Sequence, residues 1–220
     1  MKRVTKKESS IARRKANELL KQFKNKLKDK YKFSCRIVGS ATWNIITKNK
    51  DGFWDVDYQI LLTKNSKEYK DNKLSNPTQI KEDFFNILNN KYKNDKTKKV
   101  ENSTTAITYI DSNNKFSIDF VIIKLFPDNH EIIRRNNKAQ SSINEYTWNE
   151  LKKHNEAYDF FSKLNPKEKE NLIEDYILPH KIKEKEKNDG DPSKKSSCEV
   201  FIEEVNNYEY RKGNKRLYRK

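Results

Sequence analysis

Apolar residues recur at helical spacing in two stretches of the chain, residues 8–30 and 77–92. Most apolar side chains in each stretch lie three, four or eight positions apart, so they fall on one face of a helix. The positions that form the two stripes are Ile11, Leu19, Phe23 and Leu27, then Ile80, Phe84, Ile87 and Leu88. Two amphipathic helices are therefore predicted, with Ser9 or Ser10 as the cap of the first.

Four shorter stretches have the composition of β-strands. The stretch "FSCRIVGS" predicts a buried strand that ends at Gly39, followed by a short helix that opens at Ser40. "FWDVDYQILLT" is the second strand, and "TTAITYI" and "KFSIDFVIIKLF" are the third and fourth. The polar "DSNN" between the last two is typical of an antiparallel hairpin. We expect an α/β (α+β) core with a small mixed, mainly antiparallel sheet flanked by helices.

The character of the chain changes after Pro127. "INEYTWNELKKHNEAYDFFSKL" and "PKEKENLIEDYILPHKIKEKEK" predict helices, and Pro166 starts the second. Residues 187–197 predict a linker or mobile loop, and the tail beyond them is compatible with strand or helix. We therefore expect a core with its N-terminal helix over residues 1–127 and a helical C-terminal region over 128–220.

The chain is strongly basic, with 48 Lys and Arg against 32 Asp and Glu and a formal net charge of +16. Such an excess creates a positive field that attracts the phosphates of nucleotides, nucleic acids or acidic lipids. Coding rich in adenine and thymine, which favours Lys, Asn and Ile, is an alternative explanation of the same excess. Charged residues make up 36% of the chain, but 3 Trp, 11 Tyr and 11 Phe favour a folded protein.

Several classes of protein are excluded by what the sequence lacks. Cys35 and Cys198 lie far apart without a CxxC motif, and the three histidines lack ligand spacing, so neither a disulfide framework nor a zinc site is predicted. Neither a P-loop nor a dinucleotide-binding glycine motif occurs. No window approaches about 18 apolar residues, and no apolar segment follows the basic N-terminus. We expect a cytoplasmic protein without a membrane partner.

Three aspartates stand in the predicted strands. Asp55 and Asp57 lie two positions apart, so they share one strand face with their Cα atoms about 7 Å apart. Adjacent carboxylates repel and raise each other's pKa, and a strand accepts them most readily when a cation sits between them. Asp119, in "FSIDFVII", can join them if its strand pairs beside the first. Carboxylate oxygens suit Mg²⁺, with Mn²⁺ as the alternative, and two ions about 3.5–4 Å apart serve in-line phosphoryl chemistry.

Gly39 and Ser40 occupy the predicted strand-to-helix turn upstream of these acids. Glycine permits close approach of a ligand to the backbone, and the N–H groups at a helix start, with a serine hydroxyl, form an anion site. This pattern indicates phosphates on the turn and metal ions on the acids.

The stretches "IVGSATWNIIT", "WDVDYQILL" and "FSIDFVII" resemble the three motifs of the DNA polymerase β-like nucleotidyltransferase superfamily. The resemblance implies a nucleotidyltransferase core that binds an NTP, with ATP as the favoured one. The triphosphate of the NTP would lie on Gly39 and Ser40. The resemblance also implies two Mg²⁺ held by Asp55, Asp57 and Asp119, which would be both the catalytic and the metal-binding residues. By the same resemblance, Asp119 helps to activate the attacking hydroxyl, and pyrophosphate leaves.

The motifs cover residues 33–125, and 62 residues separate Asp57 from Asp119. This spacing, with a long helix before the first strand, is similar to the layout of oligoadenylate synthases and bacterial cyclic-oligonucleotide synthases. The resemblance therefore favours a nucleotide or oligonucleotide hydroxyl, RNA included, as the acceptor, and antiviral defence as the setting.

Two other functions share these residues. One is an inactive nucleotidyltransferase-fold module that binds RNA or DNA through its basic surface, although three acids would repel a phosphate backbone unless metal were bound. The other is a toxin or defence enzyme that attaches a nucleotide to tRNA or to another protein. The second alternative differs from the favoured function only in the acceptor.

Overall fold

The computed structural model describes residues 2–63, 76–125, 130–136, 145–151, 155–187 and 191–217 of the chain. The chain folds into two compact units. The sheet unit consists of Thr5–Thr42 and Phe53–Leu151, and the helical unit of Met1–Val4, Trp43–Gly52 and Lys152–Lys220. The glycine, the serine and the three aspartates of the sequence motifs all belong to the sheet unit. Residues 126–129, where we expected the boundary between two regions, lie outside the described residues.

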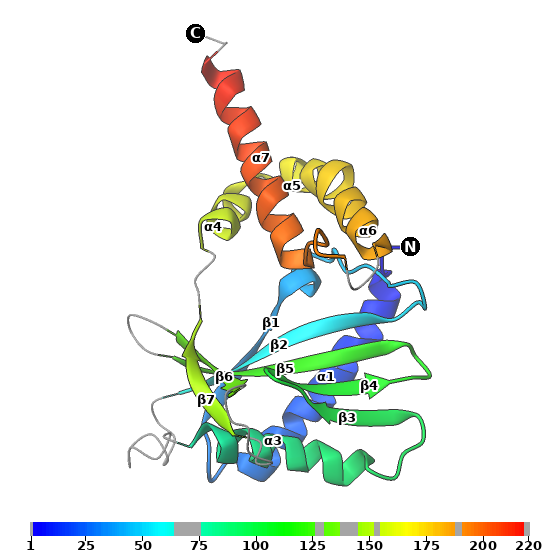
Figure 1. Cartoon of the computed structure of the whole chain (residues 1–220), viewed down its shortest axis with the longest axis vertical. Helices are drawn as coiled ribbons and strands as arrows, with labels where there is room; N and C mark the ends of the chain where they lie inside the picture. The colour runs from blue at the N-terminus through cyan, green and yellow to red at the C-terminus, as the bar shows by residue number, and fades with distance from the viewer. Residues whose placement is uncertain are drawn as a thin grey trace. The chain divides into compact units, whose positions relative to one another are not determined.

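The sheet unit contains a seven-stranded sheet in which β1, β2, β5, β4 and β3 lie side by side (Figure 1). β6 pairs with the end of β5, and β7 pairs with β6. The strands are β1 (Phe33–Val38), β2 (Trp54–Leu62), β3 (Lys98–Asn102), β4 (Ala106–Asp111), β5 (Phe116–Leu125), β6 (His130–Arg135) and β7 (Tyr146–Glu150). β2 and β5 run parallel, whereas the other described pairs are antiparallel. The expected mixed, mainly antiparallel sheet is confirmed.

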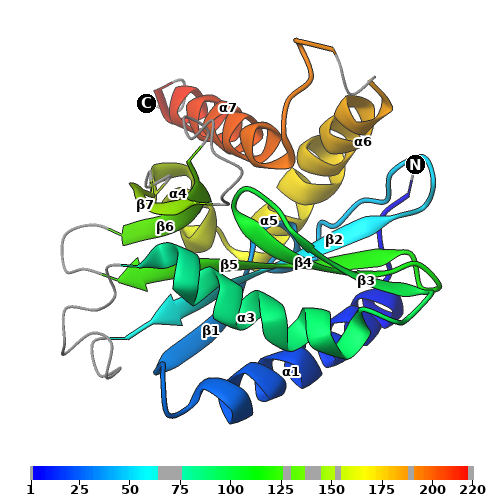
Figure 2. The same cartoon turned by 60° about the horizontal axis from the view of Figure 1, so that its bottom comes forward.

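Two helices, α1 (Lys6–Leu27) and α3 (Pro77–Tyr92), pack on one face of this sheet (Figure 2). Phe23 of α1 meets Phe84 of α3 and Phe120 of β5 edge-to-face, with ring centroids 5.1 and 5.3 Å apart. These rings are fully buried, as the two apolar stripes predicted, whereas Ile11 of the first stripe is exposed. The cap of α1 differs from the expected serines, because Thr5 forms a capping box with Glu8.

The segment after β5 differs most from the prediction. We expected a helix across residues 143–164, but residues 146–150 form β7, and α4 (Asn155–Lys163) begins only afterwards. β5 extends beyond the residues that pair with β4, and its last three residues, Ile123–Leu125, pair with β6. β7 then pairs with β6 and extends the sheet further. Tyr146 is buried there, which the strand period of two explains as well as a helical period does.

The helical unit contains α4, α5 (Pro166–Leu172), the π-helical η2 (Ile173–Ile177), α6 (Leu178–Glu186) and α7 (Ser197–Leu217). The tail, for which the sequence was compatible with strand or helix, therefore forms a helix as far as Leu217. The helices enclose an apolar core that Ile45, from the second segment of this unit, completes. Its other members are Ala157, Phe161, Leu164, Leu172, Ile173, Ile177, Leu178, Phe201 and Val205.

Two further expectations concern this unit. Of the loop predicted near residues 187–197, residues 188–190 lie outside the described part, and Asp191 accepts hydrogen bonds from the backbone and hydroxyl of Ser193. Among the described helices, none combines the length and the apolar character that crossing a bilayer requires.

Candidate functional site

The parallel pairing of β2 with β5 brings the three aspartates onto one face of the sheet. Asp57 is the register partner of Asp119, and Asp55 lies two residues away on the same face of β2. Along β2 the burial pattern alternates: Trp54 and Val56 are buried, whereas Asp55 and Asp57 are only half-buried. The face that bears the acids, which we call the carboxylate face, is therefore opposite the face that α1 and α3 cover.

A cross-strand row of residues continues from these acids. Asp119 also pairs with Thr108 of β4, and Thr108 in turn pairs with Glu101 of β3. On the other side, Asp57 pairs with Val38, the last residue of β1. Residues in register share a face, so this row places a hydroxyl and a fourth carboxylate on the carboxylate face.

Asp119 lies in an environment that perturbs its carboxyl group. Burial raises the pKa of its carboxyl group, and the negative charges of Asp55 and Glu101 raise it further. A hydrogen bond with the Thr108 side chain opposes this shift. The Oδ1 atom of Asp119 is buried and has no hydrogen-bond partner among the described residues. A buried oxygen that lacks a donor is costly, so a cation at this atom would be favourable.

Gly39 closes the site at the end of β1. Its φ angle is +64°, a left-handed conformation that glycine adopts without strain. A Cβ atom built at this position would lie 2.8 Å from Oδ2 of Asp57, closer than real contacts allow. The backbone angle therefore favours glycine here, and any larger residue would also displace the carboxylate of Asp57.

The helix expected to open at Ser40 is a single 3₁₀ turn, Gly39–Ala41, closed by a hydrogen bond of 3.1 Å from the Thr42 N–H to the Gly39 carbonyl. The chain enters this turn from extended Val38. Gly39 and Ser40 are both half-buried. The turn thus begins directly beside Asp57, on the strand that pairs with β2.

The donor chemistry of this face fits a divalent cation, because the three aspartates offer carboxylate oxygens and one of these oxygens is buried without a partner. In their present side-chain positions, no three His, Cys, Asp or Glu residues within the described ranges form a group that could hold a metal ion. Carboxylates without a counter-ion repel each other. Backbone register therefore brings the acids together, and rotation of their side chains would be needed to surround an ion.

Thr108 is the residue of this site that sequence reasoning did not identify. The signal was present in the hairpin that joins β4 and β5, whose turn occupies residues 112–115. Counting outwards from a four-residue turn pairs Asp111 with Phe116 and hence Thr108 with Asp119. A threonine is unremarkable in a strand, so only this register shows its relation to the acid.

Comparison with solved structures shows which fold this is. The STING-associated CdnE c-di-GMP synthase from Capnocytophaga granulosa is similar with a TM-score of 0.61 and 14% identity, over 93% of this chain and 61% of that one. Vibrio cholerae DncV cyclic AMP-GMP synthase in complex with a linear intermediate gives 0.57 and 13%, over 93% and 54%. The GTP-bound form of Vibrio cholerae DncV gives 0.55 and 14%, over 93% and 52%.

The chain spans about half to three-fifths of the length of these solved structures. No protein-family model and no curated protein sequence matches it. At 13–14% identity, the similarity establishes the fold and leaves the chemistry to be argued from this chain's own residues. The chain therefore has the fold of the DNA polymerase β-like nucleotidyltransferases, as its three motifs predicted.

Proposed function

We propose that this chain is a divalent-metal-dependent nucleotidyltransferase, which transfers NMP from an NTP to a hydroxyl acceptor and releases pyrophosphate. The observation that carries the proposal is the register of Asp57 with Asp119, with Asp55 on the same face, in the fold of known nucleotidyltransferases. Gly39 lies directly against one of these acids, because a Cβ atom at this position would stand 2.8 Å from Oδ2 of Asp57. The acids and the glycine turn form one arrangement.

In this proposal, Asp55, Asp57 and Asp119 hold Mg²⁺ or Mn²⁺. When bound, the ions neutralise charge that develops on the phosphates and polarise the phosphoryl oxygens. The buried Oδ1 of Asp119 gains a partner in this state. Because catalysis of this kind consists mainly of positioning and charge neutralisation, loss of a single acid should abolish turnover.

Gly39 and Ser40 would receive the triphosphate. The left-handed Gly39 starts the turn without a side chain, so phosphate oxygens can approach the backbone N–H groups closely. The Ser40 hydroxyl adds a donor. Since the turn lies beside Asp57, a triphosphate on the turn would have its phosphates next to the acids.

The transfer step is an in-line displacement at the α-phosphorus. The acceptor oxygen forms a bond to that phosphorus, the bond from it to the oxygen bridging to the β-phosphate breaks, and pyrophosphate leaves with that oxygen. The hydroxyl proton passes to the carboxylate of Asp119. A hydrogen bond with the Thr108 side chain would keep this carboxylate oriented.

A nucleotide hydroxyl is the acceptor that we favour. The similar structures include a c-di-GMP synthase and a cyclic AMP-GMP synthase bound to a linear intermediate, which are proteins that join nucleotides to nucleotides. The net charge of +16 favours phosphate-bearing substrates in general. We therefore propose ATP as the first donor to test, and a second nucleotide or an RNA end as the acceptor.

The proposal is tested by incubating the protein with each α-³²P-labelled NTP and Mg²⁺ or Mn²⁺, first alone and then with total RNA. Wild type should give labelled product, Asp57→Asn none, and Asp29→Asn, which alters an exposed aspartate after α1, the wild-type amount. Labelled small products indicate a nucleotide synthase, labelled RNA a tailing enzyme, and labelled protein a modifying toxin. If nothing is labelled while RNA binding persists equally in Asp57→Asn, the chain is a binding module and the proposal is wrong.

A further inference from the structure

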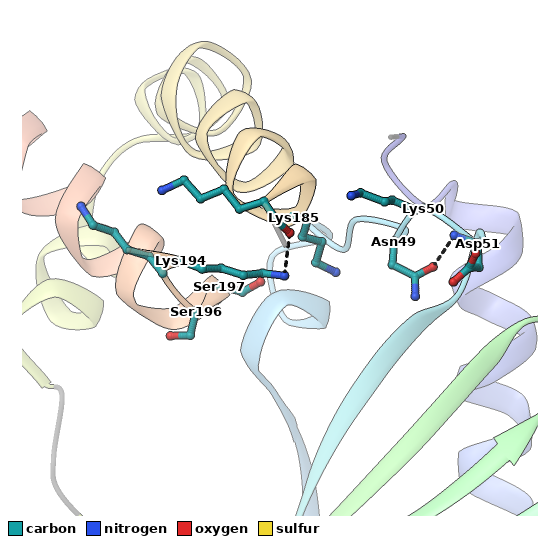
Figure 3. Close-up of a pocket in the computed structure, with 9 residues that line it drawn as sticks. Asn49, Lys50, Asp51, Lys185, Lys194, Ser196 and Ser197 are labelled. Atoms are coloured by element: carbon teal, nitrogen blue, oxygen red, sulfur yellow. Dashed lines mark hydrogen bonds between the residues drawn. The ribbon is translucent and has the colours of Figure 1, made fainter. Parts of the chain in front are cut away.

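The helical unit has a pocket of its own, with a volume of about 380 Å³, that the proposed reaction does not use (Figure 3). Three segments of that unit line it: the stretch 49–51, the end of α6 with the residue after it, and the residues that lead into α7. The lining residues are Asn49, Lys50, Asp51, Lys185, Lys187, Lys194, Lys195, Ser196 and Ser197. Among these described residues, five lysines surround one cavity with a single acid in its wall.

Two lysines of the lining form ion pairs with glutamates. Lys187 Nζ lies 2.8 Å from Glu184, and Lys195 Nζ lies 2.6 Å from Glu203. Glu203 and Lys195 are both partly exposed, so water weakens this pair. Neither glutamate belongs to the pocket lining, so these carboxylates reduce the positive charge from outside the cavity.

Two further lysines of the lining donate to backbone carbonyls. Lys185 donates a hydrogen bond of 2.7 Å to the Thr47 carbonyl, and Lys194 donates one of 3.2 Å to the Lys187 carbonyl. The Thr47 carbonyl does not cancel the charge of Lys185, whereas the negative charge of Asp191 interacts with both Lys194 and Lys187. Figure 3 shows the Lys194 side chain reaching across the pocket to that carbonyl. Lys50, on the opposite wall, is exposed.

Ammonium groups that converge on one cavity repel each other, and an anion between them relieves this repulsion. Ser196 and Ser197 add hydroxyl groups at the start of α7, where the carboxylate of Glu199 accepts a hydrogen bond from the Ser196 N–H. We propose that this pocket is a binding site for a compact ligand that carries two or three linked phosphates.

The lining also indicates how the ligand is recognised. All nine lining residues are polar or charged and none is aromatic, so the lining offers no ring on which a nucleobase could stack. The contacts are therefore to phosphate oxygens. The volume, at the lower end of the range for small-molecule sites, suits an oligophosphate. Such a group exists free, as pyrophosphate or tripolyphosphate, and as the tail of an NTP.

Isothermal titration calorimetry in EDTA tests this inference, because without divalent ions the proposed metal-dependent reaction at the carboxylate face does not take place. Three ligands, pyrophosphate, tripolyphosphate and ATP, are titrated into wild type and into the pocket variant Lys50→Gln/Lys185→Gln. The charge-matched control is Lys163→Gln/Lys183→Gln, because these two lysines are exposed and lie outside the pocket. The pocket variant should bind tripolyphosphate about tenfold more weakly, as two lost charge contacts imply, and the control as wild type does. Lys50→Gln alone, at an exposed residue, should weaken binding without a change in melting temperature.

Tighter binding of tripolyphosphate than of ATP assigns the site to free oligophosphate, and equal affinity shows that the tail of an NTP is bound as well; both support the proposal, whereas much tighter binding of ATP would show that the nucleoside is recognised and would contradict it. It is overturned if wild type binds none of the three, if both double variants weaken binding equally, or if only a single-stranded RNA oligomer binds in a pocket-dependent way. Because these titrations contain no divalent metal, their outcome is independent of whether the chain transfers nucleotides.

Discussion

Replacement of Gly39 by alanine is the sharpest test of the geometry at the carboxylate face. The added Cβ would stand 2.8 Å from Oδ2 of Asp57, whereas ordinary contacts begin at 3.4 Å, so this oxygen must move by about 0.6 Å. The atom lies at the end of a side chain, and a small rotation of Asp57 relieves the contact. The cost to folding then comes mainly from the φ angle of +64°, which in a residue with a Cβ costs about 1–2 kcal/mol.

The same displacement has a larger effect on metal binding. The Asp57 side chain must rotate to help surround an ion, and a Cβ atom at residue 39 would occupy part of the space beside its carboxylate, so one of the proposed ligands would be hindered. We expect Gly39→Ala to weaken Mn²⁺ binding about tenfold or more, with a loss of nucleotidyl transfer to match. Free Mn²⁺ measured by electron paramagnetic resonance gives the affinity, and urea denaturation gives the free energy of unfolding.

Gly213→Ala is the matched control, because no atom lies within 4 Å of the position that its Cβ would take. It should leave Mn²⁺ affinity unchanged and, within α7, leave stability equal or slightly raised. If Gly39→Ala binds Mn²⁺ as tightly as wild type while losing stability, the turn is a structural feature only. The proposed relation between the glycine turn and Asp57 would then be refuted.

Three further outcomes follow. Thr108→Val should weaken Mn²⁺ binding several-fold and Thr108→Ser should restore it, since only the hydroxyl reaches Asp119; equal affinity in both variants would contradict this role. Burial lowers the pKa of Lys81 from 10.5 to about 7. Above pH 7 the unfolded chain therefore binds one more proton at Lys81 than the folded chain does, and the free energy of unfolding should rise between pH 7 and 8.5 by at most about 1.4 kcal/mol per pH unit. Urea denaturation of Lys81→Met should lack that slope, and an unchanged slope would assign it to other groups. Phe161→Ala, which leaves a cavity in the core of the helical unit, should lower the free energy of unfolding by about 3–5 kcal/mol in the same assay. A loss below about 1 kcal/mol would show that this core is not tightly packed.

Local periodicity accounts for the parts of the fold that the sequence predicted well. The stripes of α1 and α3 predicted both helices because their burial is one-sided, and α3 has the predicted limits at Pro77 and Tyr92. The strands that carry Asp55, Asp57 and Asp119 were equally clear, because apolar residues alternate around each acid. That these strands pair in parallel is a tertiary fact that the sequence did not predict, since we expected only that Asp119 could join the other acids if its strand paired beside theirs.

The elements that the sequence missed lack such a local signal. β3 has a single apolar residue, Val100, and gains its place from the partner strand β4. The segment of β7 contains two aromatics, Tyr146 and Trp148, whose spacing fits either a strand or a helix, and pairing with β6 decides between them. The lysine pocket combines residues more than 130 positions apart, so no sequence window contains it.

The division of the chain into units has a mechanical consequence. The ten residues Trp43–Gly52 belong to the helical unit, yet they join the Gly39 turn directly to the strand of Asp55. Neither unit is a continuous piece of polypeptide, and a single proteolytic cut cannot release one from the other. The segment that contains the buried Ile45 is therefore joined by covalent bonds to the glycine turn at one end and to the acid-bearing strand at the other.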